Sequence, residues 1–282
     1  MIIIADSGST KTDWRIINGV SDIEQIEGIG LNPNFHSINS ISAAVKSTFS
    51  KFEKAKNAQV VYFYGAGCST ESQKGIVKTA LYSFFHNANI HVEHDLLGAA
   101  RAACYKNEGI AAILGTGSNV CSFDGENIIQ SFPSGGYAIG DEGGGVNIGR
   151  RVLKAYIEEY MPKELRDRFD FRYKLNIDDI LHQLYEKEQP NRFMASFSHF
   201  AYQHKENAFM ASQIMEEFQQ FFDNKVLRFD KATDWPLNTV GSVGFYYHEF
   251  LTATAEANDV KVGAIIEKPI AALSLYHSDL GQ

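Results

Sequence analysis

Hydroxyl and carboxylate side chains gather near the start of the chain, directly after an apolar segment. Residues 2–6 read IIIAD, and residues 7–12 read SGSTKT. A glycine lets the backbone turn tightly and approach a ligand closely, and backbone amides and hydroxyl groups can hydrogen-bond phosphate oxygens. Asp6, Gly8, Ser9 and Thr10 therefore make this turn a candidate phosphate-binding site.

Three further glycine-rich segments stand where strands are predicted to end. They are GTGSN at 115–119, GGYAIGDEGGG at 135–145 and GSVG at 241–244. One such turn is common in proteins and says little about function. Four of them in one chain predict a shared ligand, because ligands of α/β sheets bind at the carboxyl ends of the strands.

Several well-known motifs are absent from the sequence. The Walker A spacing GxxxxGK[ST] does not occur, and GAGCST at 65–70 has Thr70 where a dinucleotide fingerprint requires glycine. Neither a GxSxG nucleophile elbow nor an HExxH zinc pair is found. The nine histidines are scattered without the spacing of metal ligands.

The composition limits the class of partner. A formal charge of −8 over 282 residues argues against nucleic acids and anionic membranes as partners, because both need a basic surface. We expect no signal peptide before Asp6, and no apolar run approaches the roughly 20 residues of a membrane span. Cys68, Cys104 and Cys121 are predicted to be reduced and buried, as in a cytoplasmic protein.

The apolar patterning predicts an α/β fold with a repeated unit. In the first half we expect strands at 2–6, 12–17 and 22–30, a helix with an apolar face from Ile38 to Phe52, a strand at 58–67, a helix at 71–85, a strand at 89–95 and a short helix from Leu96. The second half repeats this order, beginning with a strand that enters the turn at 115–119. A strand, turn and helix at 237–251, a strand at 259–266 and a helix from Lys268 complete it.

The repeat predicts two domains that face each other across a cleft. We place the first at 1–107, with a C-terminal helix at 269–282 that packs back on it, and the second at 108–268. The polar and aromatic segment at about 162–234 is expected to be a helical insertion. Its simplest role is a packing layer, with a dimer face as the alternative.

Together, DSGSTKTDW, ILGTGSN, GDEGGG and VGSVG resemble the superfamily of sugar kinases, Hsp70 and actin. Within it the sequence is similar to the BadF/BadG/BcrA/BcrD group, which includes N-acetylglucosamine kinases. The motifs span the chain except for the insertion. The resemblance implies two ribonuclease H-like domains, a cytoplasmic homodimer, and a kinase that uses ATP and Mg²⁺ to phosphorylate an amino sugar.

The resemblance also implies nucleotide-binding residues. Asp6 would hold the hydrated magnesium ion. The remaining ATP-binding residues would lie in three turns, and they are Gly8, Ser9, Thr10, Gly115, Thr116, Gly117, Gly241 and Ser242. One carboxylate with water and phosphate oxygens suffices for Mg²⁺.

For the sugar, the resemblance places Asp95 as the catalytic base and Asn32 as a ligand of the sugar hydroxyls, with Asn34 as the alternative if the loop is shifted. Ser118, Asn119, Gly135, Gly136 and Asp141 would complete the substrate site. From the residues alone, Asp95 could instead cap the helix that follows it, and Asp141 with Glu142 could be a solvated pair.

The identity of the sugar stays open among N-acetylglucosamine, glucosamine, N-acetylmuramic acid and a glucose-like hexose. Two other functions are alternatives. One is the ATPase activator of a 2-hydroxyacyl-CoA dehydratase, which would need cysteines for an iron–sulfur cluster. The other is a sugar-sensing protein without catalysis, for which the sequence offers no added DNA-binding segment.

Overall fold

The computed structural model describes residues 1–8, 10–19 and 22–278, which form two units with one five-stranded sheet each. Unit 1 contains Met1–Lys106 and the segment from Lys268 onward, and unit 2 contains Asn107–Glu267. Ser9, one of the predicted phosphate-binding residues, lies outside the described residues.

Unit 1 contains a mixed sheet with the strand order β3-β2-β1-β4-β5. Its strands are β1 (Ile2–Ser7), β2 (Lys11–Ile17), β3 (Ile23–Ile29), β4 (Val60–Gly65) and β5 (Asn89–His94). The first three are antiparallel neighbours, whereas β4 and β5 run parallel to β1.

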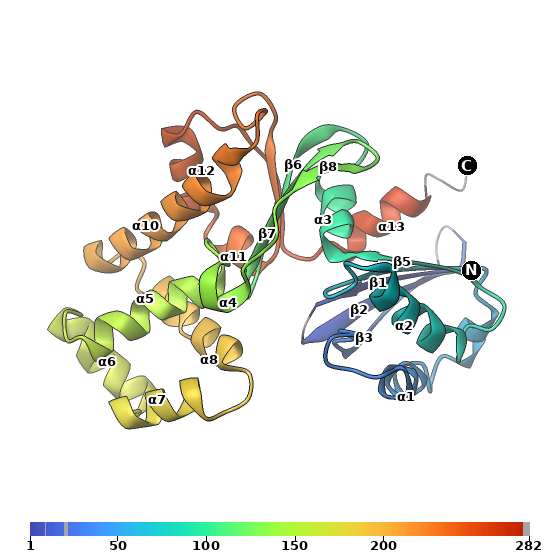
Figure 1. The fold of residues 1–282 in the computed structure, drawn as a ribbon, viewed down its shortest axis with the longest axis horizontal. Coiled ribbons are helices and arrows are strands. Elements are labelled where there is room, and N and C mark those ends of the chain that lie inside the picture. Colours follow the sequence, from blue (N-terminus) through green and yellow to red (C-terminus); the bar gives the residue numbers. More distant parts are fainter. Residues whose placement is uncertain (9, 20–21, 279–282) are drawn as a thin grey trace. The chain divides into compact units, whose positions relative to one another are not determined.

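Helices cover both faces of this sheet. Helices α1 (Ile38–Thr48) and α2 (Glu71–Tyr82) pack on one face, and α3 (Asp95–Ala103) and α13 (Ile270–Ser278) pack together on the other (Figure 1). A short 3-10 helix, η1 (Glu53–Asn57), follows α1. Trp14 is buried, and its ring meets that of Phe49 edge-on at 5.1 Å. This aromatic cluster fixes α1 on the sheet.

Unit 2 repeats this topology, because its sheet has the order β10-β9-β6-β7-β8. The strands are β6 (Glu108–Leu114), β7 (Ser118–Asp124), β8 (Ile128–Ser131), β9 (Leu237–Val240) and β10 (Val262–Ile266). Here β6, β7 and β8 are antiparallel neighbours, and β9 and β10 run parallel to β6. The predicted α/β fold with a duplicated unit is therefore confirmed.

The helices of unit 2 include the expected insertion. Helices α4 (Gly136–Ile139), α5 (Gly145–Ile157), α11 (Ser242–Tyr246) and α12 (His248–Ala257) belong to the repeated unit. The insertion consists of α6 (Lys163–Tyr173), α7 (Ile177–Tyr185), α8 (Pro190–Ser196), α9 (Ser198–Gln203), α10 (Ala208–Asn224) and the 3-10 helix η2 (Val226–Arg228). In Figure 1, α6 and α7 lie on the side of α5 away from the sheet.

Among the predicted boundaries that are wrong, two concern Phe52 and Asp95. The helix expected to reach Phe52 ends at Thr48, and Phe52 is instead the N-cap of the 3-10 helix η1. The strand expected to end at Asp95 ends at His94, so Asp95 is the first residue of α3. Asp95 is therefore not the N-cap of α3; that position belongs to His94.

Candidate functional site

The two predicted acidic residues lie at the same end of the unit 1 sheet. Asp6 of β1 is level with Tyr64 of β4, and Gly65 of β4 is level with His94 of β5. Because these three strands are parallel, their carboxyl ends meet at one edge. The sheet therefore brings Asp6 and the following residue of β5, Asp95, to one place.

The electrostatics of this edge favour a bound cation. Burial raises the pKa of Asp6 to about 7, with further increases from the carboxylates of Asp95 and Asp13 and a smaller opposing effect of Lys11. Burial also raises the pKa of Asp95, against the opposing charge of His94. These two half-buried carboxylates resist ionisation, and a positive ion beside them would stabilise their ionised forms.

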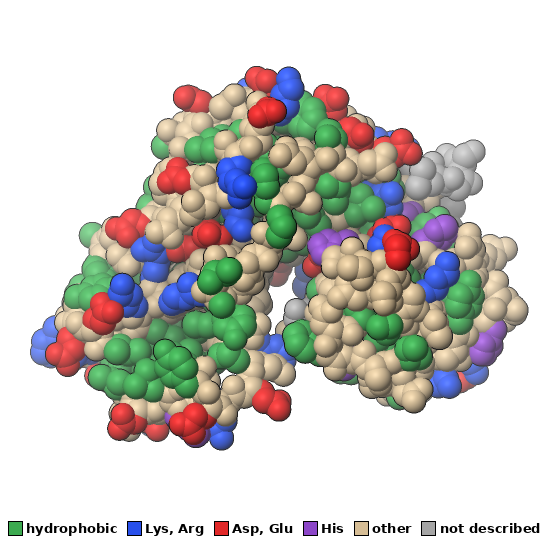
Figure 2. Space-filling model, in the orientation of Figure 1, with side chains coloured by type: hydrophobic (Ala, Val, Ile, Leu, Met, Phe, Trp, Pro, Cys, Tyr) green, Lys and Arg blue, Asp and Glu red, His purple; other side chains and the backbone are tan. Residues whose placement is uncertain are grey.

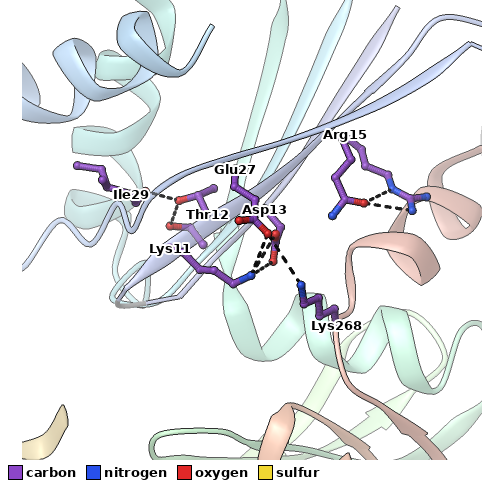
Figure 3. A network of polar contacts seen from close by, with 9 residues as sticks. Lys11, Thr12, Asp13, Arg15, Glu27, Ile29 and Lys268 are labelled. Atoms are coloured by element: carbon purple, nitrogen blue, oxygen red, sulfur yellow. Dashed lines mark hydrogen bonds and ion pairs between the residues drawn. The ribbon is translucent and has the colours of Figure 1, made fainter. Parts of the chain in front are cut away.

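A chain of hydroxyl groups holds the turn after β1 in place. The Thr12 hydroxyl donates to the carbonyl of Ile29 at 2.8 Å, so the Ser7 hydroxyl, 2.8 Å from Thr12 Oγ1, is the donor in that pair (Figure 3). The backbone N–H of Leu31 in turn donates to Ser7 Oγ at 3.0 Å. These bonds join β1, β2, the end of β3 and the segment after it; those of Ser7 are buried, and that between Thr12 and Ile29 is partly buried.

Lys11, the first residue of β2, forms ion pairs beside this turn. Its Nζ lies 3.2 Å from Asp13 Oδ2 and 3.3 Å from Glu27 Oε1, and Lys268 approaches Glu27 at 3.9 Å (Figure 3). The lysine side chain is 45% exposed, as expected of a surface charge that pairs across neighbouring strands.

The predicted sugar ligand Asn32 is buried in the loop after β3. Its Oδ1 accepts from the backbone N–H of Asn34 at 2.9 Å. A Cβ on Gly67 would lie 2.3 Å from that oxygen, so the loop after β4 packs directly against it. Asn34, the alternative ligand, accepts through Oδ1 from Gln73 of α2. Asn32 is thus held in one orientation near the sheet edge.

In unit 2 the turn after β6 packs on the start of α5. The N–H of Gly145 donates to the Gly115 carbonyl at 2.8 Å, and the N–H of Val146 donates to that of Thr116 at 2.9 Å. Gly241, which precedes α11, has φ +123°, and a Cβ there would lie 2.3 Å from the Leu114 carbonyl oxygen. Only glycine lets the two turns approach this closely.

Asp141 connects the turn at 115–117 to the segment predicted to bind sugar. It is buried, and its Oδ1 accepts from the Ser118 N–H at 3.2 Å and from the Ser134 hydroxyl at 3.0 Å. A Cβ on Gly117 would lie 2.6 Å from Oδ2. Asp141 therefore forms hydrogen bonds within the protein and is not a solvated loop carboxylate.

The other predicted residues of this segment lie around α4 and β7. Gly135 and Gly136 form the start of α4, and Gly136 has φ +61°. Ser118 and Asn119 are the first two residues of β7. Consecutive strand residues point to opposite faces of a sheet, so the two side chains leave the start of β7 on opposite sides.

Two adjoining cavities join the predicted ATP-binding residues of unit 2 to the insertion. One of about 220 Å³ is lined by Gly115, Thr116 and Ser242, among others, and the next, of about 330 Å³, is bounded by Tyr202 and Tyr246. Both are lined by Ser198, His199, Ser242 and Val243. The first cavity is polar, which suits a phosphate chain. The second is aromatic, which suits the base of a nucleotide.

Sequence reasoning missed the contribution of the insertion to these cavities. Arg192, Ser196, Ser198 and His199 come from α8 and α9, which were expected to form a packing layer. The polar residues of SFSHF at 196–200 were a signal, because they interrupt an otherwise apolar helical pattern.

The side chains around Asp6 limit how a magnesium ion could be held. Among the described residues, no group of three or more His, Cys, Asp or Glu side chains could hold a metal. Magnesium is usually held by one or two carboxylates together with water and substrate phosphates. A pair of carboxylates with raised pKa at the sheet edge fits that mode of binding, and does not fit an all-protein cage.

A duplicated five-stranded sheet, with glycine and hydroxyl turns at the strand ends, defines the actin-like class of nucleotide-binding folds. The chain matches the BadF/BadG/BcrA/BcrD ATPase family over residues 5–219. It therefore belongs to that family, as the sequence motifs predicted.

Solved and curated relatives agree with this assignment. One solved structure is that of a Porphyromonas gingivalis protein named as a proposed N-acetylglucosamine kinase. It is 38% identical to this chain, has a TM-score of 0.95, and the match covers both chains fully. A similarly named protein from Chromobacterium violaceum is 14% identical over 98% of each chain, has a TM-score of 0.71 and shows the fold alone.

The N-acetylmuramic acid/N-acetylglucosamine kinase of Clostridium acetobutylicum is 27% identical over 138 residues. That match covers 47% of this chain and 45% of the relative, so the chain spans about half the length of the curated protein that it matches.

Proposed function

We propose that the protein is an ATP-dependent sugar kinase that phosphorylates the 6-hydroxyl of an amino sugar, with N-acetylglucosamine as the first candidate. Membership of an ATPase family supports the use of ATP, and the names of the relatives support the sugar. The observation that carries the proposal is the meeting of Asp6 and Asp95 at the carboxyl end of one sheet.

Phosphoryl transfer requires positioning of the reactants and stabilisation of negative charge. In the proposal, Asp6 holds Mg²⁺ through water, and Gly8, Ser9 and Thr10 bind the β- and γ-phosphates. The turn at 115–117 binds the phosphates as well, and Gly241 and Ser242 contact the adenosine. The cavities beside Thr116 and Ser242 support this assignment.

A sugar hydroxyl at neutral pH needs a base within hydrogen-bond reach. In the proposal Asp95 accepts the hydroxyl proton as the new O–P bond forms. Asn32, Ser118, Asn119, Gly135, Gly136 and Asp141 would bind the sugar. Mg²⁺, when bound, would neutralise charge on the transferring phosphate. The fixed orientation of Asn32 supports its role in this set.

The dehydratase-activator alternative receives no support from the cysteines. Cys68, Cys104 and Cys121 are all among the described residues, are all buried, and form no disulfide. Ligands for a cluster shared between subunits would need to lie at a surface.

We further propose a cytoplasmic location, where buried thiols stay reduced. Within the described residues, no helix has the length and apolar character needed to cross a bilayer.

A homodimer is also proposed, with a small-molecule sugar and no nucleic acid as partners. Exposed apolar side chains gather over α6 and α7 of the insertion (Figure 2), and they include Phe171, Ile177, Leu181 and Tyr185. Phe171 is 83% exposed. An exposed apolar patch is a common feature of protein interfaces.

Light scattering of the wild type and of Phe171→Glu tests the proposed homodimer. The variant should be monomeric at a concentration at which the wild type is dimeric.

A coupled assay of ADP release over a set of sugars tests the kinase. We expect Mg²⁺-dependent turnover with N-acetylglucosamine that exceeds turnover with glucose, and rates with glucosamine and N-acetylmuramic acid would rank the remaining candidates. The absence of sugar-stimulated ADP release with all four sugars would contradict the proposal. Sugar binding without ADP release would instead support a sensing protein.

A further inference from the structure

Helix α10 of the insertion presents a stripe of three buried side chains. Glu217, Phe221 and Lys225 follow one another at steps of four residues, the last as the C-cap of the helix. Residues at this spacing lie on one face of an α-helix. Glu217 is only 2% exposed and Lys225 only 7%, although charged side chains are almost never fully buried unless they are paired.

The stripe pairs with two consecutive residues of the loop between α4 and α5. Oε1 of Glu217 accepts a hydrogen bond from the backbone N–H of Gly143 at 3.0 Å, and Nζ of Lys225 lies 3.3 Å from Oε2 of Glu142. Phe221 packs closely on Gly143, because a Cβ added to that glycine would lie 2.9 Å from the Cβ of Phe221. One face of α10 thus fixes both the side chain of Glu142 and the backbone of Gly143.

The same face is tied to the helix that follows the loop. Oε2 of Glu217 accepts from Nε of Arg151 on α5 at 2.7 Å, so its two oxygens serve two separate donors. Buried ion pairs contribute little net stability compared with apolar side chains of similar size, and a layer that only packed could be apolar throughout. Charge-assisted hydrogen bonds add a specific geometry that apolar contacts do not supply.

The loop that α10 holds contacts the turn at 115–117. Oδ1 of Asp141 accepts from the N–H of Ser118, and a Cβ on Gly144 would lie 2.7 Å from the carbonyl carbon of Gly117. These two contacts flank the pair of residues that α10 holds. A shift of that pair would therefore disturb the support of the turn from both sides.

The backbone of Asp141 also depends on its neighbours. Its φ is +60°, in the left-handed region, and a residue other than glycine keeps such a conformation only where its surroundings enforce it. The side chain of Asp141 is bound to Ser118 and Ser134. The contacts of α10 with the next two residues fix the chain on the other side of Asp141.

We infer that Glu217 and Lys225 are positioning residues, through which α10 holds the segment 141–144 in the conformation that places Asp141 and the turn at 115–117 for substrate binding. The inference rests on the proposed function, in which Asp141 binds the sugar and the turn binds phosphates. It gives the insertion a role in the chemistry besides that of a packing layer.

The first test compares Lys225→Met with Lys163→Met, both in the insertion. Methionine keeps an apolar stem and removes the charge, so Glu142 loses its partner only in the first variant. Lys163 on α6 pairs with Asp167 and is 87% exposed. We expect kcat/KM for the sugar to fall by about 10- to 100-fold in Lys225→Met, since a misplacement of about 1 Å can cost on the order of 10²-fold. Lys163→Met should stay within about twofold of the wild type.

Glu217→Gln gives an independent variant with the same shape. The single carbonyl oxygen of glutamine can accept from Gly143 or from Arg151 but cannot replace both carboxylate oxygens, so a smaller loss of the same kind is expected. All rates are measured well below the melting temperature of each variant. The folded fraction is then the same, and a loss of overall stability alone leaves the rates unchanged.

Amide hydrogen exchange gives a second readout that needs no substrate. The N–H groups of Ser118 and Gly145 bond to Asp141 and to Gly115. Their exchange should be faster by about tenfold or more in Lys225→Met than in Lys163→Met, while the amides of β6 exchange as in the wild type.

Unchanged sugar kinetics and unchanged exchange in both Lys225→Met and Glu217→Gln would overturn the inference while leaving the kinase intact. Exchange that accelerates equally throughout unit 2 would assign the two residues to overall stability and would overturn it as well. A wild type without sugar-dependent ADP release would overturn the proposed function, and the exchange measurement would then decide alone whether α10 holds the loop.

Discussion

The carboxyl ends of the two sheets differ in chemistry although their topology is the same. In unit 1 this end carries Asp6 and Asp95, both with raised pKa. In unit 2 the turn at the corresponding place, 115–117, contains two glycines and a threonine, and a polar cavity opens beside it. One end suits a cation and a base, and the other suits an anion.

This difference shows how a duplicated fold acquires two roles. The strand order fixes where a side chain can be placed, and the residue that follows each strand decides what the place can do. Substitutions of Asp6 and Asp95 in unit 1 should therefore affect the chemical step, whereas substitutions in the turns at 115–117 and 241–244 of unit 2 should affect nucleotide binding or the stability of the turns.

Asp95→Asn gives the largest expected effect. Asn keeps the shape of the side chain but cannot accept the sugar proton, so kcat should fall by a factor of about 10² or more. Sugar binding, measured by calorimetry, should persist. Turnover close to that of the wild type would show that Asp95 is not the base and would remove the contrast between the two units.

Gly241→Ala tests the close approach of the turns in unit 2. The added Cβ would lie 2.3 Å from the Leu114 carbonyl at a φ of +123°, so the free energy of unfolding should fall by about 1–3 kcal/mol. The matched control is Gly75→Ala on α2, where nothing lies within 4 Å of an added Cβ. Alanine favours a helix there, so a loss in the control equal to that in Gly241→Ala would contradict the account.

His277 gives unit 1 a pH-dependent stability. Burial lowers its pKa from 6.5 to about 3, and it packs between Tyr64, hydrogen-bonded at 2.9 Å, and the ring of Tyr62 at 3.6 Å. Between these values the unfolded state binds more protons than the folded state, so stability is present above about pH 6.5 and falls as pH decreases toward 3.

Urea unfolding at pH 7 and pH 5 measures this effect. From pH 7 to pH 5, the wild type should lose at least about 1 kcal/mol more, or gain that much less, than His277→Gln. The raised pKa of Asp6 acts in the opposite direction and is shared by both proteins. Exposed His86, changed to Gln, serves as the control. Equal changes in the wild type and His277→Gln would rule out this role for His277.

His199→Ala should have the smallest effect, confined to the nucleotide. His199 lines both cavities beside Ser242, so KM for ATP should rise by a factor of about 3 to 10, which corresponds to roughly 0.6–1.4 kcal/mol. KM for the sugar should not change. A change in sugar KM of equal size would indicate that the insertion does not serve the nucleotide alone.

Most of the fold could be predicted from the sequence, because short apolar runs ending in glycine turns indicate buried strands. The start of α3 could not, since Asp is a favoured N-cap and only the structure shows that His94 has that position. The end of α1 was predicted too late because Phe52 continues the apolar spacing into η1.

Part of the candidate site depends on contacts between segments far apart in the chain. The cavities beside Ser242 combine it with residues about 40 to 50 positions earlier in α8 and α9, and local periodicity carries no such information. The contact of Asp141 with Ser118 similarly joins two loops whose approach depends on Gly117. The identity of a ligand is set by such contacts and not by fold alone.

The most direct test of the central claim is the product itself. The protein is incubated with ATP, Mg²⁺ and N-acetylglucosamine, and the mixture is followed by ³¹P NMR with proton correlation. The account predicts a phosphomonoester coupled to the C6 protons of the sugar, formed by the wild type and not by Asp95→Asn. Inorganic phosphate as the sole product, or an equal yield from Asp95→Asn, would contradict it.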